Sequence, residues 1–364
     1  MSDIPQDRSR DRRPVADVRS RPTPFLLLDR ERLSANVSAM AELAHQRGLS
    51  LRPHAKTHKC AEVAGLQTGA GATGLTVATV SEAQVFADAG FRDLFLAYPL
   101  WVDAAKGARL RRLAERASLL LGVDSIPGVR ALAAQLPGCA VLLEVDSGHH
   151  RSGVLPAEAG DLADSAVHCG LQVRGVFTFP GHSYAPGAAA KVAADEALAL
   201  GMAATSVSDR GIEVQVVSGG STPSAAAAHA DVLTELRPGV YVFGDAQQWE
   251  LGTTTPEQLA LTCVGTVVSR AAGHVVLDAG SKAIGADRAP WASGHGRLLD
   301  HPEARIVQLS EHHAVVAWDG SPPPEVGSRL RVVPNHVCTA VNLADELVVD
   351  DGDVWPVIAR GTNT

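Results

Sequence analysis

The sequence predicts a parallel α/β barrel followed by a smaller, mostly antiparallel β domain. In residues 23–255, short apolar runs alternate with Ala- and Leu-rich stretches of helical periodicity, which is typical of repeated βα units. After about residue 256 the helical periodicity is lost, and Val- and Leu-rich runs separated by Gly, Pro and Asp indicate short strands. The 364 residues suffice for a large barrel and a second domain.

The N-terminal part of the chain begins with a polar segment. Residues 1–22 are rich in Arg, Asp, Ser and Pro and contain no apolar run, so the sequence predicts a disordered tail. The apolar run 25–28 is expected to form a strand. An amphipathic helix should follow it, because apolar residues recur at helical spacing from Leu33 to Ala44 until Gly48 ends the pattern.

Eight apolar runs are expected to form a TIM-type (β/α)8 barrel, with helices connecting them. The expected strands are 51–56, 75–80, 93–98, 118–123, 140–146, 172–179, 213–219 and 238–243. The expected helices between them are 81–89, 103–116, 127–135, 156–169 and 187–210. An open, doubly wound sheet is the alternative, but no Gly-x-Gly-x-x-Gly segment follows an early strand, which argues against it.

The second domain is expected to span residues 256–364. Its expected strands are 260–270, 274–284, 304–309, 313–319, 328–334 and 346–358. For the whole chain, the net charge of −8 argues against nucleic acid or an anionic membrane as the main partner, and no apolar run approaches the roughly 20 residues of a membrane span. The five cysteines include no Cys-x-x-Cys pair, so no disulfide framework is expected and a cytoplasmic location is the default.

The segment 51–59 (Leu-Arg-Pro-His-Ala-Lys-Thr-His-Lys) ends the first barrel strand with a lysine between two histidines. Burial at a strand end and nearby imidazolium charge should lower the pKa of Lys56. A lysine with a depressed pKa is suited to form a Schiff base with a carbonyl group. The alternative is that Lys56 and Lys59 are surface charges that follow a strand.

Polar residues also follow the later barrel strands. The segment 218–224 (Ser-Gly-Gly-Ser-Thr-Pro-Ser) follows the seventh strand, where barrel enzymes often bind phosphate through backbone N–H groups and hydroxyls. Arg151 follows the fifth strand and Tyr184 the sixth. An arginine there can bind a phenolate oxygen or a carboxylate, and a tyrosine can meet a ring nitrogen. A simple turn, a salt bridge and a buried hydroxyl are the alternatives.

The second domain contributes the segment 334–339 (Pro-Asn-His-Val-Cys-Thr). On a strand, His336 and Cys338 would point to the same side of the sheet. Imidazole and thiolate together suit Zn²⁺ better than Mg²⁺ or Ca²⁺. Because only two ligands occur locally, a metal bound there would keep positions open for water or substrate, as catalytic metals do.

Taken together, these segments resemble the D-threonine aldolase and D-serine dehydratase-like family of fold type III pyridoxal-phosphate enzymes, which have an alanine racemase-like barrel and a β domain. The resemblance covers about residues 22–360, and its first and last segments are the most specific. It rests on residues 52–59, 146–154, 181–184, 218–224, 237–239 and 334–338.

This resemblance implies a cofactor site on the barrel. Lys56 would carry pyridoxal phosphate as a Schiff base and act as the catalytic base. Arg151 would lie near the phenolic oxygen of the cofactor and Tyr184 near its pyridine nitrogen. The phosphate would be held by Gly220, Ser221 and Thr222, with Tyr241 close by.

The resemblance also implies that His336 and Cys338 bind a divalent metal beside the cofactor, Zn²⁺ first and Mn²⁺ or Mg²⁺ as alternatives. Strand 25–28 would join the second domain, and a head-to-tail homodimer would complete each site. The metal would act as a Lewis acid on the β-hydroxyl of the substrate. The expected function is therefore a lyase that acts on D-3-hydroxyamino acids as small-molecule substrates.

Dehydration and deamination of a D-serine or D-threo-3-hydroxyaspartate type of substrate is the preferred reaction, since His plus Cys resembles the zinc-dependent dehydratases. Retro-aldol cleavage to glycine and an aldehyde, as in D-threonine aldolase, is the alternative. An amino-acid racemase and a pyridoxal-phosphate carrier without catalysis are the remaining hypotheses.

Overall fold

The structure of the chain, a computed structural model, describes residues 18–364 except 272 and 320–321. Most of the tail that was expected to be disordered, residues 1–17, lies outside the described residues. Val18–Ser20 forms a short 3-10 helix, and Arg21 forms an ion pair with Glu346. None of the helices in the described part of the chain is long and apolar enough to cross a membrane.

Eight parallel strands form the first sheet, in the order β2-β9-β8-β7-β6-β5-β4-β3. Its two edges meet, because a parallel bridge joins His54 to Thr76 and the Thr76 amide donates a 2.9 Å hydrogen bond to the Pro53 carbonyl. The sheet therefore closes into the predicted parallel barrel. The strands are β2 (Ser50–Leu51), β3 (Leu75–Val77), β4 (Asp93–Pro99), β5 (Ser118–Val123), β6 (Ala140–Glu144), β7 (Gln172–Phe177), β8 (Val216–Gly219) and β9 (Glu235–Leu236).

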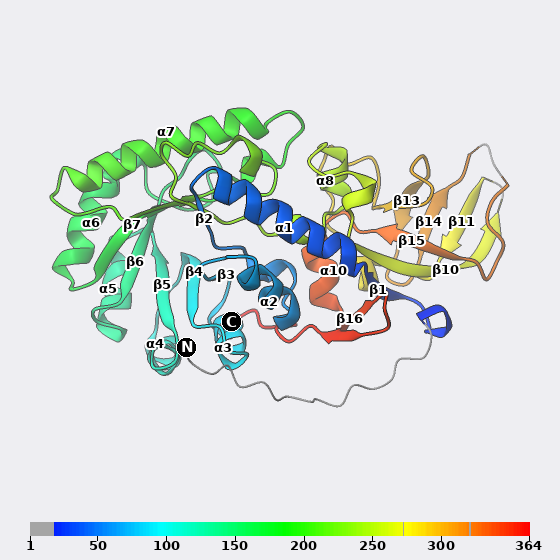
Figure 1. Cartoon of the computed structure of the whole chain (residues 1–364), viewed down its shortest axis with the longest axis horizontal. Coiled ribbons are helices and arrows are strands. Elements are labelled where there is room, and N and C mark those ends of the chain that lie inside the picture. The colour runs from blue at the N-terminus through cyan, green and yellow to red at the C-terminus, as the bar shows by residue number, and fades with distance from the viewer. Residues whose placement is uncertain (1–17, 272, 320–321) are drawn as a thin grey trace.

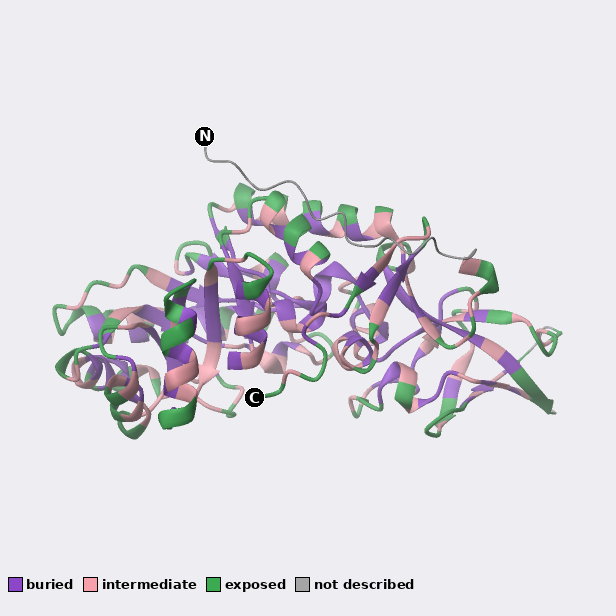
Figure 2. Ribbon diagram, turned by 90° about the horizontal axis from the view of Figure 1, so that it is seen from below, coloured by how far each residue is buried: buried purple, intermediate pink, exposed green. Residues whose placement is uncertain are grey.

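Helices cover the outside of this barrel (Figure 1). Several begin where a side-chain oxygen accepts a backbone N–H, as Asp29 does for α1 and Thr79 for α3. Their apolar sides pack on the sheet, whereas their outer faces are exposed (Figure 2). The helices are α1 (Arg30–Gln46), α2 (Ala61–Gly69), α3 (Val80–Asp88), α4 (Ala104–Ala114), α5 (Ile126–Gln135), α6 (Ala159–His168) and α7 (Ala189–Ser208).

The second sheet has nine strands, nearly all antiparallel. Its longest strand, β10 (Leu261–Ala271), pairs with β1, β11 and β15, so that β10 to β15 close into a small barrel. Strand β1 (Phe25–Leu28) precedes the first barrel in the sequence but pairs with β10 and β16 in this second sheet. The other strands are β11 (His274–Leu277), β12 (Arg297–Leu298), β13 (Arg305–Leu309), β14 (Ala314–Ala317), β15 (Arg329–Val333), β16 (Glu346–Val349) and β17 (Val354–Pro356).

The structure corrects two expected barrel strands. Strand eight was expected at 238–243, but β9 ends at Leu236 and Val240–Val242 forms the 3-10 helix η6. Pro238 has no N–H to continue a ladder, and Gly239 lies so close to η2 that a Cβ there would be 2.6 Å from the Thr57 hydroxyl. Likewise β2 has only two residues, of which Leu51 alone falls in the expected strand 51–56, and the segment after it turns into the 3-10 helix η2 (Ala55–Thr57).

A buried arginine links three strands of the barrel. Arg52, directly after β2, places Nε 2.7 Å from Glu235 of β9 and Nη1 2.6 Å from Asp93 of β4. Glu235 is 4% exposed and also accepts a hydrogen bond from Ser218 of β8. The ion pairs therefore lie where the two edges of the sheet meet.

Replacing Arg52 with Ala should lower the free energy of unfolding by roughly 3–5 kcal/mol, because the Glu235 carboxylate would stay buried without its cation. Urea unfolding followed by circular dichroism measures this loss. The matched control is Arg116→Ala, which removes an exposed ion pair with Asp88 and should lower the free energy by at most about 1 kcal/mol. Equal, small losses in both variants would contradict a role of Arg52 in closing the barrel.

Candidate active site

A cavity of about 270 Å³ lies where the barrel strands end and the second domain begins. Most of its walls come from segments that follow strands of the barrel, and two residues come from the segment around α10 (Val337–Leu343) of the second domain. Figure 1 shows α10 at the junction of the two domains. The cavity is lined by His54, Lys56, Thr57, His149, Phe179, Gly181, Tyr184, Ser221, Arg237, Gly239, Val240, His336 and Cys338.

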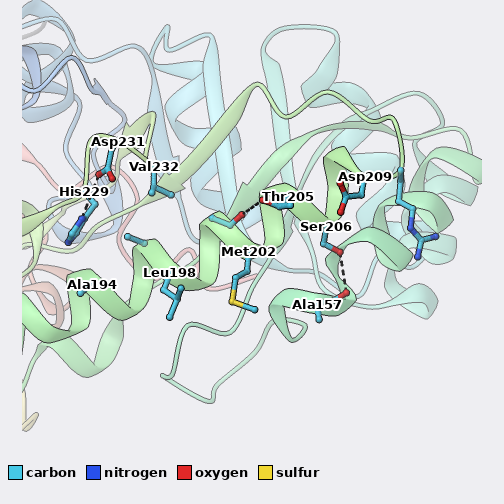
Figure 3. Close-up of a pocket in the computed structure, with 13 residues that line it drawn as sticks. Ala157, Ala194, Leu198, Met202, Thr205, Ser206, Asp209, His229, Asp231 and Val232 are labelled. Atoms are coloured by element: carbon cyan, nitrogen blue, oxygen red, sulfur yellow. Dashed lines mark hydrogen bonds and ion pairs between the residues drawn. The ribbon is translucent and has the colours of Figure 1, made fainter.

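A larger, shallower hollow of about 890 Å³ lies on the outside of α7 (Figure 3). Leu198 and Met202 form its apolar floor, and His229 and Asp231 lie at one end. Arg210, which also lines it, is already paired with Asp161 and Asp164. None of the site residues predicted from the sequence lines this hollow, so the smaller cavity is the candidate active site.

Lys56 lies in η2 with its side chain in the cavity. Burial lowers its pKa, and the nearby positive charges of Arg151 and Arg237 lower it further, against the opposing effect of Cys338. The flanking histidines are not the cause that was expected. Burial holds the pKa of His54 well below its ordinary value and that of His58 at about 4, so both rings are neutral near pH 7.

The neighbouring lysines have other partners. Lys59 is buried, forms a 3.0 Å ion pair with Glu82 and donates to the Ala359 carbonyl. Lys282 forms an exposed 2.8 Å ion pair with Glu311. Among the described residues, Lys56 forms no ion pair with a carboxylate, which leaves its amine available to a ligand in the cavity.

The segment 218–224 turns at Gly220, whose φ of +80° favours glycine. The Gly220 amide is already bonded to the buried Glu196 carboxylate of α7 at 2.7 Å. Ser221 lines the cavity, and its hydroxyl lies 2.7 Å from that of Ser183 and 2.9 Å from that of Ser224. Of the three residues expected at the phosphate, Ser221 is therefore the one with a side chain on the cavity wall.

Two tyrosines meet this segment in different ways. Tyr184 lines the cavity and its hydroxyl is bonded to Thr222, while burial raises its pKa. Tyr241 meets Thr222 only through its backbone amide, at 3.1 Å. The Tyr241 hydroxyl accepts a 3.0 Å hydrogen bond from Gln67 instead and is absent from the cavity wall.

Arg151 lies at the edge of the site. Its side chain is 50% exposed, and its guanidinium lies 5.1 Å from the ring centre of Phe179, the same ring that Lys56 Nζ approaches at 5.5 Å. The arginine on the cavity wall is Arg237, which is buried and donates to Ser218 at 2.8 Å.

His336 and Cys338 both line the cavity, but the strand expected to carry them is wrong. His336 is the extended N-cap of α10, and Cys338 lies in the first turn of that helix. The Cys338 sulfur is 3.3 Å from the Thr57 hydroxyl, and His336 Nδ1 is 3.3 Å from the Asp245 carboxylate. The bend at the N-cap, rather than the alternation of a strand, brings imidazole and thiol together.

The two side chains also polarise each other. Burial would raise the pKa of Cys338, but the charges of His336 and Lys56 outweigh it, so this pKa is lowered. The pKa of His336 lies well above its ordinary value, chiefly because of the Cys338 thiolate and then because of Asp245. A thiolate beside an imidazole is a donor set that suits Zn²⁺.

Several residues of the site were not singled out from the sequence, and His149, Gly239 and Asp245 are examples. His149 lines the cavity and stacks on His182 with ring centres 6.3 Å apart. Gly239 lines it because the expected strand is a turn. Asp245, fully buried beside His336, is 91 positions away in the chain, so only its N-cap position before α8 (Ala246–Glu250) is visible in the sequence.

Comparisons with known proteins place these features in context. Residues 28–247 match the family model "Alanine racemase, N-terminal domain", and residues 260–349 match "Putative serine dehydratase domain". D-threo-3-hydroxyaspartate dehydratase of Delftia sp. is 34% identical over 87% of this chain and 90% of its own length. D-threonine aldolase of Arthrobacter sp. is 34% identical over 93% of both chains.

Solved structures agree with these matches. The Delftia dehydratase has a TM-score of 0.85 at 32% identity over 93% of this chain and 97% of its own, and a cysteine-to-alanine variant of it was solved in a metal-free form. D-threonine aldolase of Filomicrobium marinum has a TM-score of 0.85 at 30% identity over 97% of this chain and 99% of its own. This chain therefore belongs to the D-threonine aldolase and D-serine dehydratase-like family of the alanine racemase-like, fold type III enzymes, as its sequence predicted.

Proposed function

We propose that this protein is a pyridoxal-phosphate- and metal-dependent lyase that acts on D-3-hydroxyamino acids. The observation that carries the proposal is the meeting of Lys56, His336 and Cys338 in one cavity built by both domains. A lysine with a lowered pKa suits a Schiff-base cofactor, and an imidazole next to a thiolate is a donor pair that suits zinc.

The residues around Lys56 fit pyridoxal phosphate. Lys56 would hold it covalently, and Ser221 with the turn at Gly239 and Val240 would face its phosphate. Thr222 and Gly220 would shape this phosphate site, since their groups already bond to Tyr184, Tyr241 and Glu196. We further propose that Tyr184 lies near the pyridine nitrogen and Arg151 near the phenolic oxygen, with Tyr241 supporting the loop from behind.

When bound, the cofactor would supply an electron sink for charge that develops at the substrate Cα. Lys56, whose pKa is lowered by burial, would take the α-proton. His336 and Cys338 would hold a divalent ion, Zn²⁺ before Mn²⁺ or Mg²⁺, next to the β-hydroxyl group of the substrate, where a Lewis acid favours departure or deprotonation of that oxygen. The metal-free variant of the Delftia relative supports a metal in this family.

We favour dehydration and deamination, because the pair His336 and Cys338 resembles that of the zinc-dependent dehydratases. Retro-aldol cleavage is the second candidate, since a dehydratase and an aldolase are both 34% identical to this chain. A homodimer and a cytoplasmic location remain part of the proposal. A racemase or a carrier of pyridoxal phosphate has less support, since neither needs the pair His336 and Cys338.

The reaction is tested by incubating the protein, loaded with pyridoxal phosphate and Zn²⁺, with D-serine, D-threonine and D-3-hydroxyaspartate. We expect a keto acid and ammonia, because the pair His336 and Cys338 resembles that of the zinc-dependent dehydratases. Chromatography of the products decides between the two reactions, since glycine and an aldehyde would indicate the aldolase. The L-enantiomers serve as controls, and conversion to the other enantiomer alone would overturn the proposal in favour of a racemase.

Borohydride reduction of the loaded protein should attach the pyridoxyl group to Lys56, because the amines of Lys59 and Lys282 are paired with carboxylates. Peptide mass spectrometry locates the label, and Lys56→Ala should lose the visible absorbance of the bound cofactor. Lys282→Ala is the control and should keep it. A label on Lys59 or Lys282 would contradict the assignment.

Cys338→Ala or treatment with EDTA should abolish turnover, by at least about 100-fold, and leave the cofactor absorbance in place, because Lys56 belongs to the barrel and Cys338 to the second domain. Elemental analysis and turnover are measured on the same samples. Cys338→Asp should regain part of the activity with Mn²⁺ or Mg²⁺, which accept carboxylates. Cys263→Ala, a buried cysteine remote from the cavity wall, is the control. Full activity without metal would remove the Lewis acid from the proposal.

A further inference from the structure

We propose that Asp245 is a positioning residue that fixes His336 as a metal ligand through its Nε2 atom. The inference rests on the proposed function, because it assumes that His336 and Cys338 bind a metal. It concerns a carboxylate that is 0% exposed and lies directly behind the cavity wall.

The Asp245 carboxylate is held from two directions. Its Oδ1 accepts a 2.8 Å hydrogen bond from the Gln248 amide at the start of α8. Its Oδ2 accepts a 3.3 Å hydrogen bond from the Val337 amide at the start of α10 and lies 3.3 Å from His336 Nδ1. Among the described residues, His336 is the only one that forms an ion pair with Asp245. The carboxylate therefore has one fixed position relative to the imidazole.

This arrangement determines which ring nitrogen carries the hydrogen. An ionised carboxylate only accepts hydrogen bonds, so the 3.3 Å approach of Asp245 Oδ2 to His336 Nδ1 favours a hydrogen on Nδ1. A neutral imidazole has one such hydrogen, which leaves the lone pair of Nε2 for a metal. A carboxylate that accepts from a ligating histidine fixes its tautomer and ring orientation and makes the ligand more basic.

Charge balance supports the same role. A divalent ion bound by the Cys338 thiolate retains one positive charge. The buried negative charge of Asp245 compensates it at the distance of one imidazole ring. Without Asp245, the ion and its ligand would be buried with less compensation, which is unfavourable.

The test compares Asp245→Asn with wild type. Asparagine is also a good N-cap, so it can still accept the Gln248 amide, but its NH₂ group would face His336 Nδ1 and favour the tautomer with a hydrogen on Nε2. Zn²⁺ affinity of the metal-free, cofactor-loaded proteins is measured by competition with a chelator, and we expect it to fall roughly 10- to 100-fold. With Co²⁺, the sulfur-to-cobalt absorption band should weaken or shift.

Asp103→Asn is the matched control. Asp103 is the N-cap of α4 and accepts a 2.8 Å hydrogen bond from the Lys106 amide, but it is exposed and does not line the cavity. This control should bind Zn²⁺ and Co²⁺ as the wild type does. Unchanged metal affinity and spectrum in Asp245→Asn would overturn the inference, whereas a wild-type protein that binds no Zn²⁺ would overturn the metal site itself.

A measurement on the wild type covers the case in which Asp245→Asn does not fold. Nitrogen-15 labelling of histidine, with His336→Gln to assign the signal, reports the tautomer in the zinc-loaded protein. We expect a hydrogen on Nδ1 and none on Nε2. The opposite tautomer would overturn the inference without any need for a folded variant.

Discussion

The candidate site depends on the close packing of α10 from the second domain against η2 of the barrel. The two elements approach each other closely. The Cys338 sulfur lies 3.3 Å from the Thr57 hydroxyl, and the neighbouring Gly239 has no room for a Cβ beside Thr57. Lys56 adjoins Thr57 in the chain, and Cys338 lies one residue after Val337, whose amide is bonded to Asp245. The separation of lysine and thiol thus depends on contacts between the two domains, and neither domain alone contains both groups.

Electrostatics inside the cavity follows from this packing. Closing the two domains over Lys56 removes water from its amine and thereby lowers its pKa, while the same closure would hinder ionisation of Cys338. The thiol ionises more readily because His336 and Lys56 lie within reach and because it is hydrogen-bonded to Thr57. Lys59, by contrast, forms a direct ion pair with the buried carboxylate of Glu82. Two lysines three positions apart therefore have different chemistry.

Much of the fold could be predicted from local sequence patterns. The run 118–123 coincides with β5, because an uninterrupted apolar segment between turn residues reads directly as a buried strand. The expected strand at 238–243 was wrong. The prediction followed the apolar residues of this run, although Pro238 and Gly239 both disfavour a strand. His336 and Cys338 were selected correctly as cavity residues, but on the assumption of a strand, whereas the N-cap of α10 places them there. Asp245 could not be inferred at all, because its contact with His336 depends on how two domains pack.

The buried Glu196 carboxyl group behind the turn at Gly220 makes the stability of the folded chain depend on pH. Burial raises the pKa of Glu196 to about 7, although the Gly220 amide opposes this shift. In an unfolded chain the same group would release its proton near its ordinary pKa of about 4.3. Between these two values the folded chain holds a proton that the unfolded chain has lost, so this group favours folding less as the pH rises through that window. Mild acidification should therefore stabilise the folded chain through Glu196, which makes the proton itself a ligand of this protein.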